Sequence, residues 1–253
     1  MNPFIYSVII VVALALSSFF NVCISRIPEQ KSLLLPSFCP RCNSKIKWYD
    51  NIPLLSFVVL RGRCRSCHSR ISLRYPLVEF LGTALIIFAL WHLGLNARGL
   101  LATAMLCLLF IVAVIDFERQ IIPNKLVVAG VLLSFGRFFF EPFWPDAFWG
   151  AIVGGGFLLA AGEVGRLLFK KRSMGAGDVK FAAMLGIFIG AKGIFVSLLL
   201  AIFLAAFGGT IAILSGKLRR SRIPFGPFIA AATGTYILFP SMLNTLFYNL
   251  YGF

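Results

Sequence analysis

Long apolar runs separated by short polar connections are the feature that most constrains how this chain can fold. About eight such runs occur, near residues 4–24, 76–95, 99–115, 125–140, 147–169, 179–191, 193–215 and 225–250. A membrane-spanning helix needs about 20 mostly apolar residues. Hydrophobic residues make up 59% of the 253 residues, against 13% charged, which exceeds the roughly 45–50% apolar content of soluble domains. We therefore predict an all-α polytopic membrane protein with about eight transmembrane helices.

The first apolar run could be confused with a secretory signal peptide. It has no basic start and no small-x-small cleavage site, and it is longer than the apolar region of most signal peptides. We expect it to remain as an uncleaved first transmembrane helix.

Positive charge is concentrated in three segments between the apolar runs, residues 26–74, 170–172 and 217–222. The chain holds 24 Lys and Arg against 9 Asp and Glu, a net charge of +15. Basic loops stay in the cytoplasm, and eight spans with an outer N-terminus would put all three segments on that side. Membrane topology and attraction to anionic lipid account for this charge, so we expect lipid as a partner and no nucleic acid.

The loop after the first run contains two cysteine pairs, "CPRC" and "CRSC", separated by 21 residues. The four cysteines are Cys39, Cys42, Cys64 and Cys67. Four thiolates with this spacing suit a tetrahedral zinc ion, and disulfides are rare in the cytoplasm, so zinc is favoured over two disulfides. Four protein ligands leave no open position, which predicts a structural metal. His68 is an alternative ligand, although a solvated neighbour is the simpler interpretation.

These observations divide the chain into three predicted parts. Residues 1–26 form the first transmembrane helix, residues 27–75 a small cytoplasmic zinc-binding domain, and residues 76–253 a membrane domain.

Two aspartates are expected at the same membrane face. Asp116 ends the third apolar run and Asp178 begins the sixth, so the predicted topology places both on the cytoplasmic side. Two carboxylates within about 4–6 Å share a proton, and such a pair can carry out acid–base hydrolysis. The competing interpretation is two unrelated acids at helix ends, since an aspartate is favourable at a helix N-terminus.

Glu118 competes with Asp116 for a place in this pair. The two positions are about 200° apart on a helix, so only one can face Asp178. Asp116 directly follows the apolar run, and we expect it to lie deeper than Glu118.

The residues around Asp178 support a special role for this segment. Gly175 and Gly177 precede it and allow close approach of a substrate backbone. Lys180 either tunes the site or extends its charge to the interface. Two other acids, Glu79 and Glu163, fall inside predicted spans, where an acid is a functional candidate; Glu163 could instead pair with Arg166.

Five further segments, taken in order, resemble one known family. They are "SSFFNVCISRIP" (17–28), "RYPLVEFLG" (74–82), "DFERQIIPN" (116–124), "GAGDVKFAAMLG" (175–186) and "IPFGPFIA" (223–230). With the paired cysteines, they make the chain similar to type IV prepilin peptidases, membrane aspartyl proteases of the Gly-x-Gly-Asp kind. The resemblance covers roughly residues 15–235.

The resemblance implies an activity, a location and a site. Asp116 and Asp178 would be the catalytic pair, supported by Gly175, Gly177 and Lys180. The substrates would be prepilins and the pilin-like subunits (pseudopilins) of type II secretion, cut at the cytoplasmic face of the bacterial inner membrane. Members with such a cysteine domain commonly also methylate the new N-terminus with S-adenosylmethionine, and no residue here is assigned to that step.

Two other function classes are compatible with the apolar pattern. A proton- or cation-coupled transporter also uses intramembrane acids, but it predicts inverted repeats and acids at the midplane, and the sequence has neither. A membrane adaptor could use the zinc domain to bind a partner and would need neither aspartate.

Overall fold

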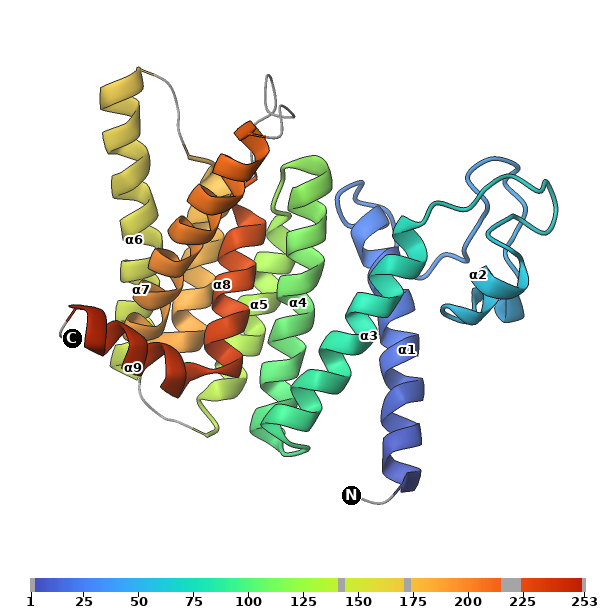
Figure 1. The fold of residues 1–253 in the computed structure, drawn as a ribbon, viewed down its shortest axis with the longest axis horizontal. Helices are drawn as coiled ribbons and strands as arrows, with labels where there is room; N and C mark the ends of the chain where they lie inside the picture. The colour runs from blue at the N-terminus through green and yellow to red at the C-terminus, as the bar shows by residue number, and fades with distance from the viewer. Residues whose placement is uncertain (1–2, 141–143, 171–173, 215–223, 252–253) are drawn as a thin grey trace. The chain divides into compact units, whose positions relative to one another are not determined.

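The computed structural model describes residues 3–140, 144–170, 174–214 and 224–251. Within these residues the regular structure is helical, and the only extended pairing is two isolated β-bridges. The elements are α1 (Pro3–Arg26), η1 (Trp48–Asn51), α2 (Leu55–Val59), α3 (Arg74–Leu93), α4 (Ala97–Arg119), α5 (Asn124–Arg137), α6 (Trp144–Phe169), α7 (Ala176–Leu214), α8 (Gly226–Leu238) and α9 (Pro240–Tyr251). The predicted all-α fold is confirmed (Figure 1).

Within the described residues the apolar runs lie in helices, the last run being divided between α8 and α9, but not every one of these helices is long enough to cross a bilayer alone. Five are, namely α1, α3, α4, α6 and α7. A sixth span results if α8 and α9, which meet at 103°, are counted together. The helix α5 has 14 residues, or about 21 Å at 1.5 Å per residue, which is short of the roughly 30 Å hydrocarbon core.

The long helix α7 turns back on itself, which explains why two apolar runs share one element. Gly190 interrupts it with φ +79° and ψ 175°, a conformation that glycine adopts without steric penalty. A Cβ atom on Gly154 of α6 would contact the carbonyl of Ala182 and would lie 3.0 Å from Cγ1 of Ile194. In a straight helix these two residues would be about 18 Å apart. The two halves of α7 therefore lie side by side against α6.

The side chain of Asp146, in the first turn of α6, supports this reversal. Its Oδ1 accepts a hydrogen bond of 3.0 Å from the amide of Ala191, the first residue after Gly190. A carboxylate at the N-terminus of the second half of α7 satisfies a free amide and complements the helix dipole.

The chain groups into two compact units, Met1–His92 and Leu93–Phe253. In the first unit, α1 packs against α3 through a buried hydrogen bond of 2.9 Å between the hydroxyls of Ser17 and Thr83. Nearby, the Asn21 amide donates to the carbonyl of Tyr75 over 3.1 Å. The three-part division at residues 26 and 75 is finer than this grouping and stays a prediction.

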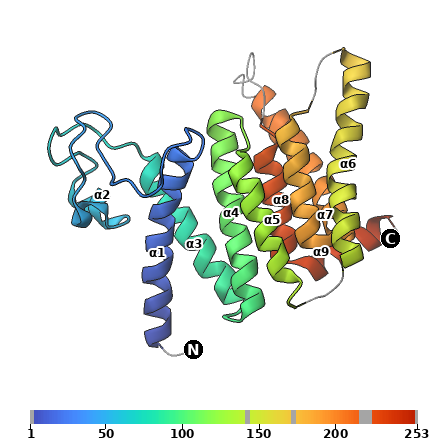
Figure 2. The same cartoon turned by 180° about the vertical axis from the view of Figure 1, so that it is seen from behind.

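In the second unit, α5 lies between α4 and α7, as views from opposite sides show (Figures 1 and 2). Helix α8 packs against both α4 and α7. The closest helix contact joins α6 to α7, where Gly150 and Gly186 bring the two backbones together because neither carries a side chain. This packing brings the end of α4, the start of α7 and the start of α8 into one region.

Candidate functional site

Asp116 occupies the last turn of α4, and its side chain is directed at the start of α8. The residue is 5% exposed. Its Oδ2 accepts a hydrogen bond of 3.0 Å from the amide of Gly226, the first residue of α8. The free amides of a helix N-terminus favour a negative charge, so α8 both orients this carboxylate and stabilises its ionised form.

Asp178 lies in the first turn of α7 and is half-buried. Its amide donates a hydrogen bond of 3.1 Å to the carbonyl of Gly175. A Cβ atom on Gly175 would lie only 3.1 Å from Oδ2 of Asp178, so the carboxylate folds back over this glycine. The helix packing of the second unit brings this turn of α7 and the end of α4, which carries Asp116, into one region. The assignment of the two acids as a catalytic pair stays a prediction.

The segment between α4 and α5 packs on the start of α7. A Cβ atom on Gly177 would lie 3.3 Å from Cβ of Ile122. The Lys180 ammonium is exposed and donates a hydrogen bond of 3.4 Å to Oδ1 of Asn124, the first residue of α5. Lys180 thus joins α7 to α5 near the aspartates, which links the two aspartate motifs of the sequence.

The other candidate acids have different surroundings. Glu118 is exposed, as expected from its position two residues beyond Asp116. Glu163 forms an ion pair with Arg166 one turn later on α6, and both side chains are more than half exposed. Glu79 belongs to the first unit, where its carboxylate accepts a hydrogen bond from the amide of Leu54.

Gly226 is the residue of this region that sequence reasoning did not single out. For the "PFGP" stretch, the sequence leaves two interpretations of Pro224 and Pro227 open, a broken helix beside the site or an ordinary helix start, and neither involves the glycine. A Cβ atom at Gly226 would lie 2.6 Å from Oδ2 of Asp116. The sequence feature that could have pointed to Gly226 is its position between two prolines. The structure adds that no side chain fits at this position.

The four cysteines converge on one point in the first unit. The Sγ atoms of Cys39, Cys42, Cys64 and Cys67 all lie within 4.8 Å of one another. The Cys39 and Cys67 sulfurs are 3.9 Å apart, close to the roughly 3.8 Å edge of a tetrahedron with zinc–sulfur bonds of 2.3 Å. The donor set suits a zinc ion, and the sulfur spacing is close to that of a tetrahedral site.

The two cysteine pairs are built alike. Each is flanked by a β-bridge, Phe38 with Lys45 and Arg63 with Arg70. In each, the residue after the second cysteine has a left-handed backbone and donates its amide to the first cysteine's carbonyl over 2.9 Å; these residues are Asn43 and His68. Because His68 takes the place of Asn43 in the repeat, it is a turn residue and not part of the sulfur cluster.

Local hydrogen bonds favour the thiolate form of Cys39 and Cys67, whereas the pKa of Cys42 is raised. Backbone amides of Cys42 and Arg41 lower the pKa of Cys39 to about 6. The hydroxyl of Ser69 lowers the pKa of Cys67. Zinc binds the thiolate form of cysteine, so both effects favour binding of the metal.

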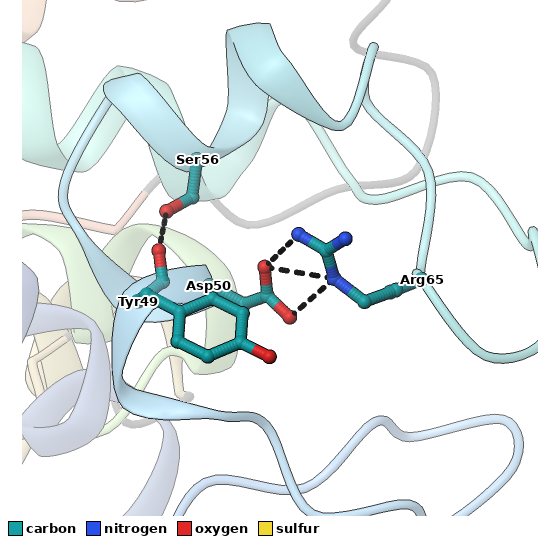
Figure 3. Close-up of polar contacts among 4 residues, drawn as sticks. All are labelled: Tyr49, Asp50, Ser56 and Arg65. Atoms are coloured by element: carbon teal, nitrogen blue, oxygen red, sulfur yellow. Dashed lines mark hydrogen bonds and ion pairs between the residues drawn. The ribbon is translucent and has the colours of Figure 1, made fainter.

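An ion pair joins η1 to the second cysteine pair (Figure 3). The guanidinium of Arg65, next to Cys64, contacts both carboxylate oxygens of Asp50, with an Nη2–Oδ1 distance of 2.6 Å and an Nε–Oδ2 distance of 2.8 Å. This contact lowers the pKa of Asp50. The hydroxyl of Ser56 donates to the Tyr49 carbonyl over 3.0 Å, joining α2 to η1.

Comparison with known proteins identifies the family. Residues 11–93 match the model of the bacterial peptidase A24 N-terminal domain, and residues 103–210 match that of the type IV leader peptidase family. A prepilin leader peptidase/N-methyltransferase of Stutzerimonas stutzeri is 34% identical over 93% of this chain and 91% of its own length. The chain belongs to the type IV leader peptidase family.

Other family members show the same extent of similarity. The prepilin leader peptidase/N-methyltransferase of Klebsiella pneumoniae is 38% identical over 79% of this chain and 92% of its own length. The relative from Myxococcus xanthus is 39% identical over 85% of this chain and 65% of its own length. No solved structure matches the chain. These relatives carry peptidase and methyltransferase names and none that indicates a transporter.

Family membership and the apolar helices make this a multi-pass integral membrane protein. The three basic segments that predicted its orientation are only partly described, because Lys171, Arg172 and the whole segment 217–222 lie outside the described residues.

Proposed function

We propose that this protein cleaves the leader peptides of type IV prepilins and of pilin-like type II secretion subunits, and that it methylates the new N-terminus. The observation that carries the cleavage is the arrangement of Asp116 and Asp178 at the end of α4 and the start of α7, where Ile122 of the loop after Asp116 packs against Gly177, directly before Asp178. The prepilin leader peptidase/N-methyltransferase names of the relatives support the substrate class and the second activity.

Asp116 and Asp178 take different roles in the proposed cleavage. Asp116, held by the Gly226 amide, is the ionised member and takes a proton from water. Asp178 is the protonated member and donates to the scissile carbonyl as water adds to its carbon. When the C–N bond breaks, Asp116 passes its proton to the leaving amine and Asp178 recovers one from the former carbonyl. These are general base and general acid roles.

The surroundings suit a substrate that enters from a bilayer. Gly175 and Gly177 leave room for an extended substrate backbone beside Asp178. The Lys180–Asn124 contact holds the loop after α4 against α7. In this proposal Gly175, Gly177 and Lys180 support the site and do not exchange protons with the substrate.

The two cofactors have different support. Cys39, Cys42, Cys64 and Cys67 would hold a structural zinc ion, which would fix the fold of residues 27–75 without taking part in the reaction. S-adenosylmethionine would supply the methyl group. Because no residues are assigned to its site, the methylation rests on family membership alone.

The orientation follows from charge. We place the protein in the bacterial inner membrane with an outer N-terminus, so that the basic segments, the zinc domain and the aspartates face the cytoplasm. Membrane lipid is then a partner and nucleic acid is not. Cysteine accessibility labelling in intact cells tests this arrangement.

Cleavage of a purified prepilin by the full chain in detergent tests the function. We expect the wild type to remove the leader, and Asp116→Asn and Asp178→Asn each to lower the rate by at least about 10²–10⁴-fold. Glu118→Gln is the matched control, since this acid is exposed on the same turn. With S-adenosylmethionine present, mass spectrometry of the product should show an added methyl group of about 14 Da. Cleavage that survives either aspartate substitution would refute the catalytic pair.

A further inference from the structure

An apolar surface on the zinc domain is not used by the proposed chemistry. It comprises η1 and α2, here called the anchor segment (Trp48–Asn51 and Leu55–Val59). Its large side chains are mostly exposed: Trp48 81%, Val58 73%, Val59 67% and Leu55 59%. This concentration of exposed apolar side chains in two consecutive elements marks an interaction surface.

The anchor segment is held at the depth of a membrane-spanning helix. The amide of Leu54, directly before α2, donates a hydrogen bond of 2.8 Å to Oε2 of Glu79. Glu79 lies five residues inside α3, which begins at Arg74, or about 7–8 Å along the helix axis. Helix α3 has 20 residues, about the number that just crosses the hydrocarbon core. The start of α2 therefore lies beside the second turn of α3 and not beyond its N-terminus.

The ribbon of the first unit agrees with this depth. In both views α2 lies beside the upper turns of α1 and α3 and not beyond their ends (Figures 1 and 2). Leu54 has φ +61° and ψ −46°, a conformation unusual for a residue with a side chain and retained only where contacts impose it. The Glu79 contact supplies that constraint.

Charge identifies the surface that the anchor segment fits. Residues 26–74 contain ten Lys and Arg against two acids. Arg61 and Arg63 follow α2 directly and are exposed. Apolar side chains with Trp, next to basic residues, bind at the interface of anionic membranes. A basic leader peptide would be repelled by the same charge.

We propose that the anchor segment lies in the interfacial region of an anionic lipid bilayer, beside α3, and holds the zinc domain against the membrane. Trp48, Leu55, Val58 and Val59 enter the acyl boundary, and Arg61 and Arg63 contact lipid phosphates. This inference does not depend on the proposed cleavage.

Fluorescence of the full chain in lipid nanodiscs tests the proposal. Trp48 emission is obtained as the difference between the wild type and Trp48→Phe, because three other tryptophans remain. The nanodiscs contain phosphatidylglycerol brominated high on the acyl chain. We expect the bromolipid to quench Trp48 at least twofold and aqueous iodide to quench it little. Trp48 emission that iodide quenches and bromolipid does not would overturn the proposal. Emission that neither quenches would also overturn it, since protein would then cover the segment.

Two sets of variants test which residues hold Trp48 at the lipid. Val58→Glu with Val59→Glu should reduce bromolipid quenching of Trp48 and expose it to iodide. Glu79→Ala should do the same, while Glu79→Gln, which keeps an acceptor for the Leu54 amide, should have a smaller effect. Bound zinc, measured in parallel, shows that the domain is still folded. Unchanged quenching in both the Val58/Val59 variant and Glu79→Ala would contradict the assigned anchor.

Discussion

The backbone amide of Gly226 donates a hydrogen bond to Oδ2 of Asp116 over 3.0 Å. The two residues are 110 positions apart, so only the packing of α8 on α4 brings them together. Because the donor is at a helix N-terminus, the contact favours the ionised carboxylate. The carboxylate of Asp178 has a different setting, since it folds back over Gly175 of its own segment.

Adding a side chain at Gly226 should disturb Asp116 directly. A Cβ atom there would lie 2.6 Å from Oδ2 and 3.0 Å from Cγ of Asp116. We expect Gly226→Ala to displace this carboxylate and to slow prepilin cleavage by about 100-fold, a loss typical of an ångström-scale misplacement. The rate of cleavage by purified protein measures the effect.

Gly234→Ala is the matched control for this substitution. It lies on the same helix, and a Cβ atom there would meet only Leu106, at 3.4 Å, an ordinary contact distance. It should cleave like the wild type. Equal rates for both alanine variants would mean that Gly226 does not position Asp116.

The contact between α6 and α7 leaves no room for a side chain at Gly150. A Cβ atom on Gly150 would collide with the carbonyl of Gly186. Because backbone atoms cannot move aside cheaply, we expect Gly150→Ala to destabilise the protein by about 1–3 kcal/mol. Thermal unfolding in detergent measures this loss. Gly156→Ala, on the same helix with nothing within 4 Å of its Cβ, should unfold at the wild-type temperature or above.

Zinc content should depend on the four clustered cysteines and on no other. We expect purified protein to hold one zinc ion per chain, and Cys39→Ser to lose it because three ligands hold the ion weakly. Metal analysis of the purified variants gives the stoichiometry. Cys107→Ser lies in α4, outside the cluster, and should keep its zinc. Full zinc retention in Cys39→Ser would exclude the cluster as the site.

The Asp50–Arg65 ion pair should make the stability of the zinc domain depend on pH. The pair lowers the pKa of Asp50, so its contribution is present above the ordinary aspartate pKa of about 3.9. It is lost as pH falls through the lower, folded-state value, because protonated Asp50 no longer attracts Arg65.

Asp50→Asn should therefore loosen the domain at neutral pH, and the difference from the wild type should shrink at acid pH. Trp48 emission, taken as a difference from Trp48→Phe, reports this because Trp48 packs edge-on against Tyr49. Glu29→Gln is the control, since Glu29 pairs with Lys31 in an exposed site worth little. A constant difference between Asp50→Asn and wild type across the pH range would be evidence against this pair.

Much of the candidate site followed from local sequence. Asp116 directly follows an apolar run and is buried, whereas Glu118, two residues later, is exposed. The cysteine spacing predicted the sulfur cluster, because two short Cys-x-x-Cys turns can present four thiolates to one ion.

Other features depend on contacts between distant segments. The reversal of α7 at Gly190 depends on Asp146, 45 residues from its partner Ala191, and hydrophobicity does not distinguish one long helix from two that fold back. The pairing of Lys180 with Asn124 and the depth of α2 beside Glu79 likewise involve partners far apart in sequence.

The sequence by itself determined the apolar helices, the basic and apolar segments, the cysteine cluster and the two aspartates, since periodicity, hydrophobicity and short spacings act locally. Only the tertiary structure decided that Gly226 holds Asp116, that the start of α7 packs on the loop after Asp116, and that α2 begins beside Glu79 of α3. Each of these depends on how helices pack, and packing is set by the shapes of side chains that no single segment contains.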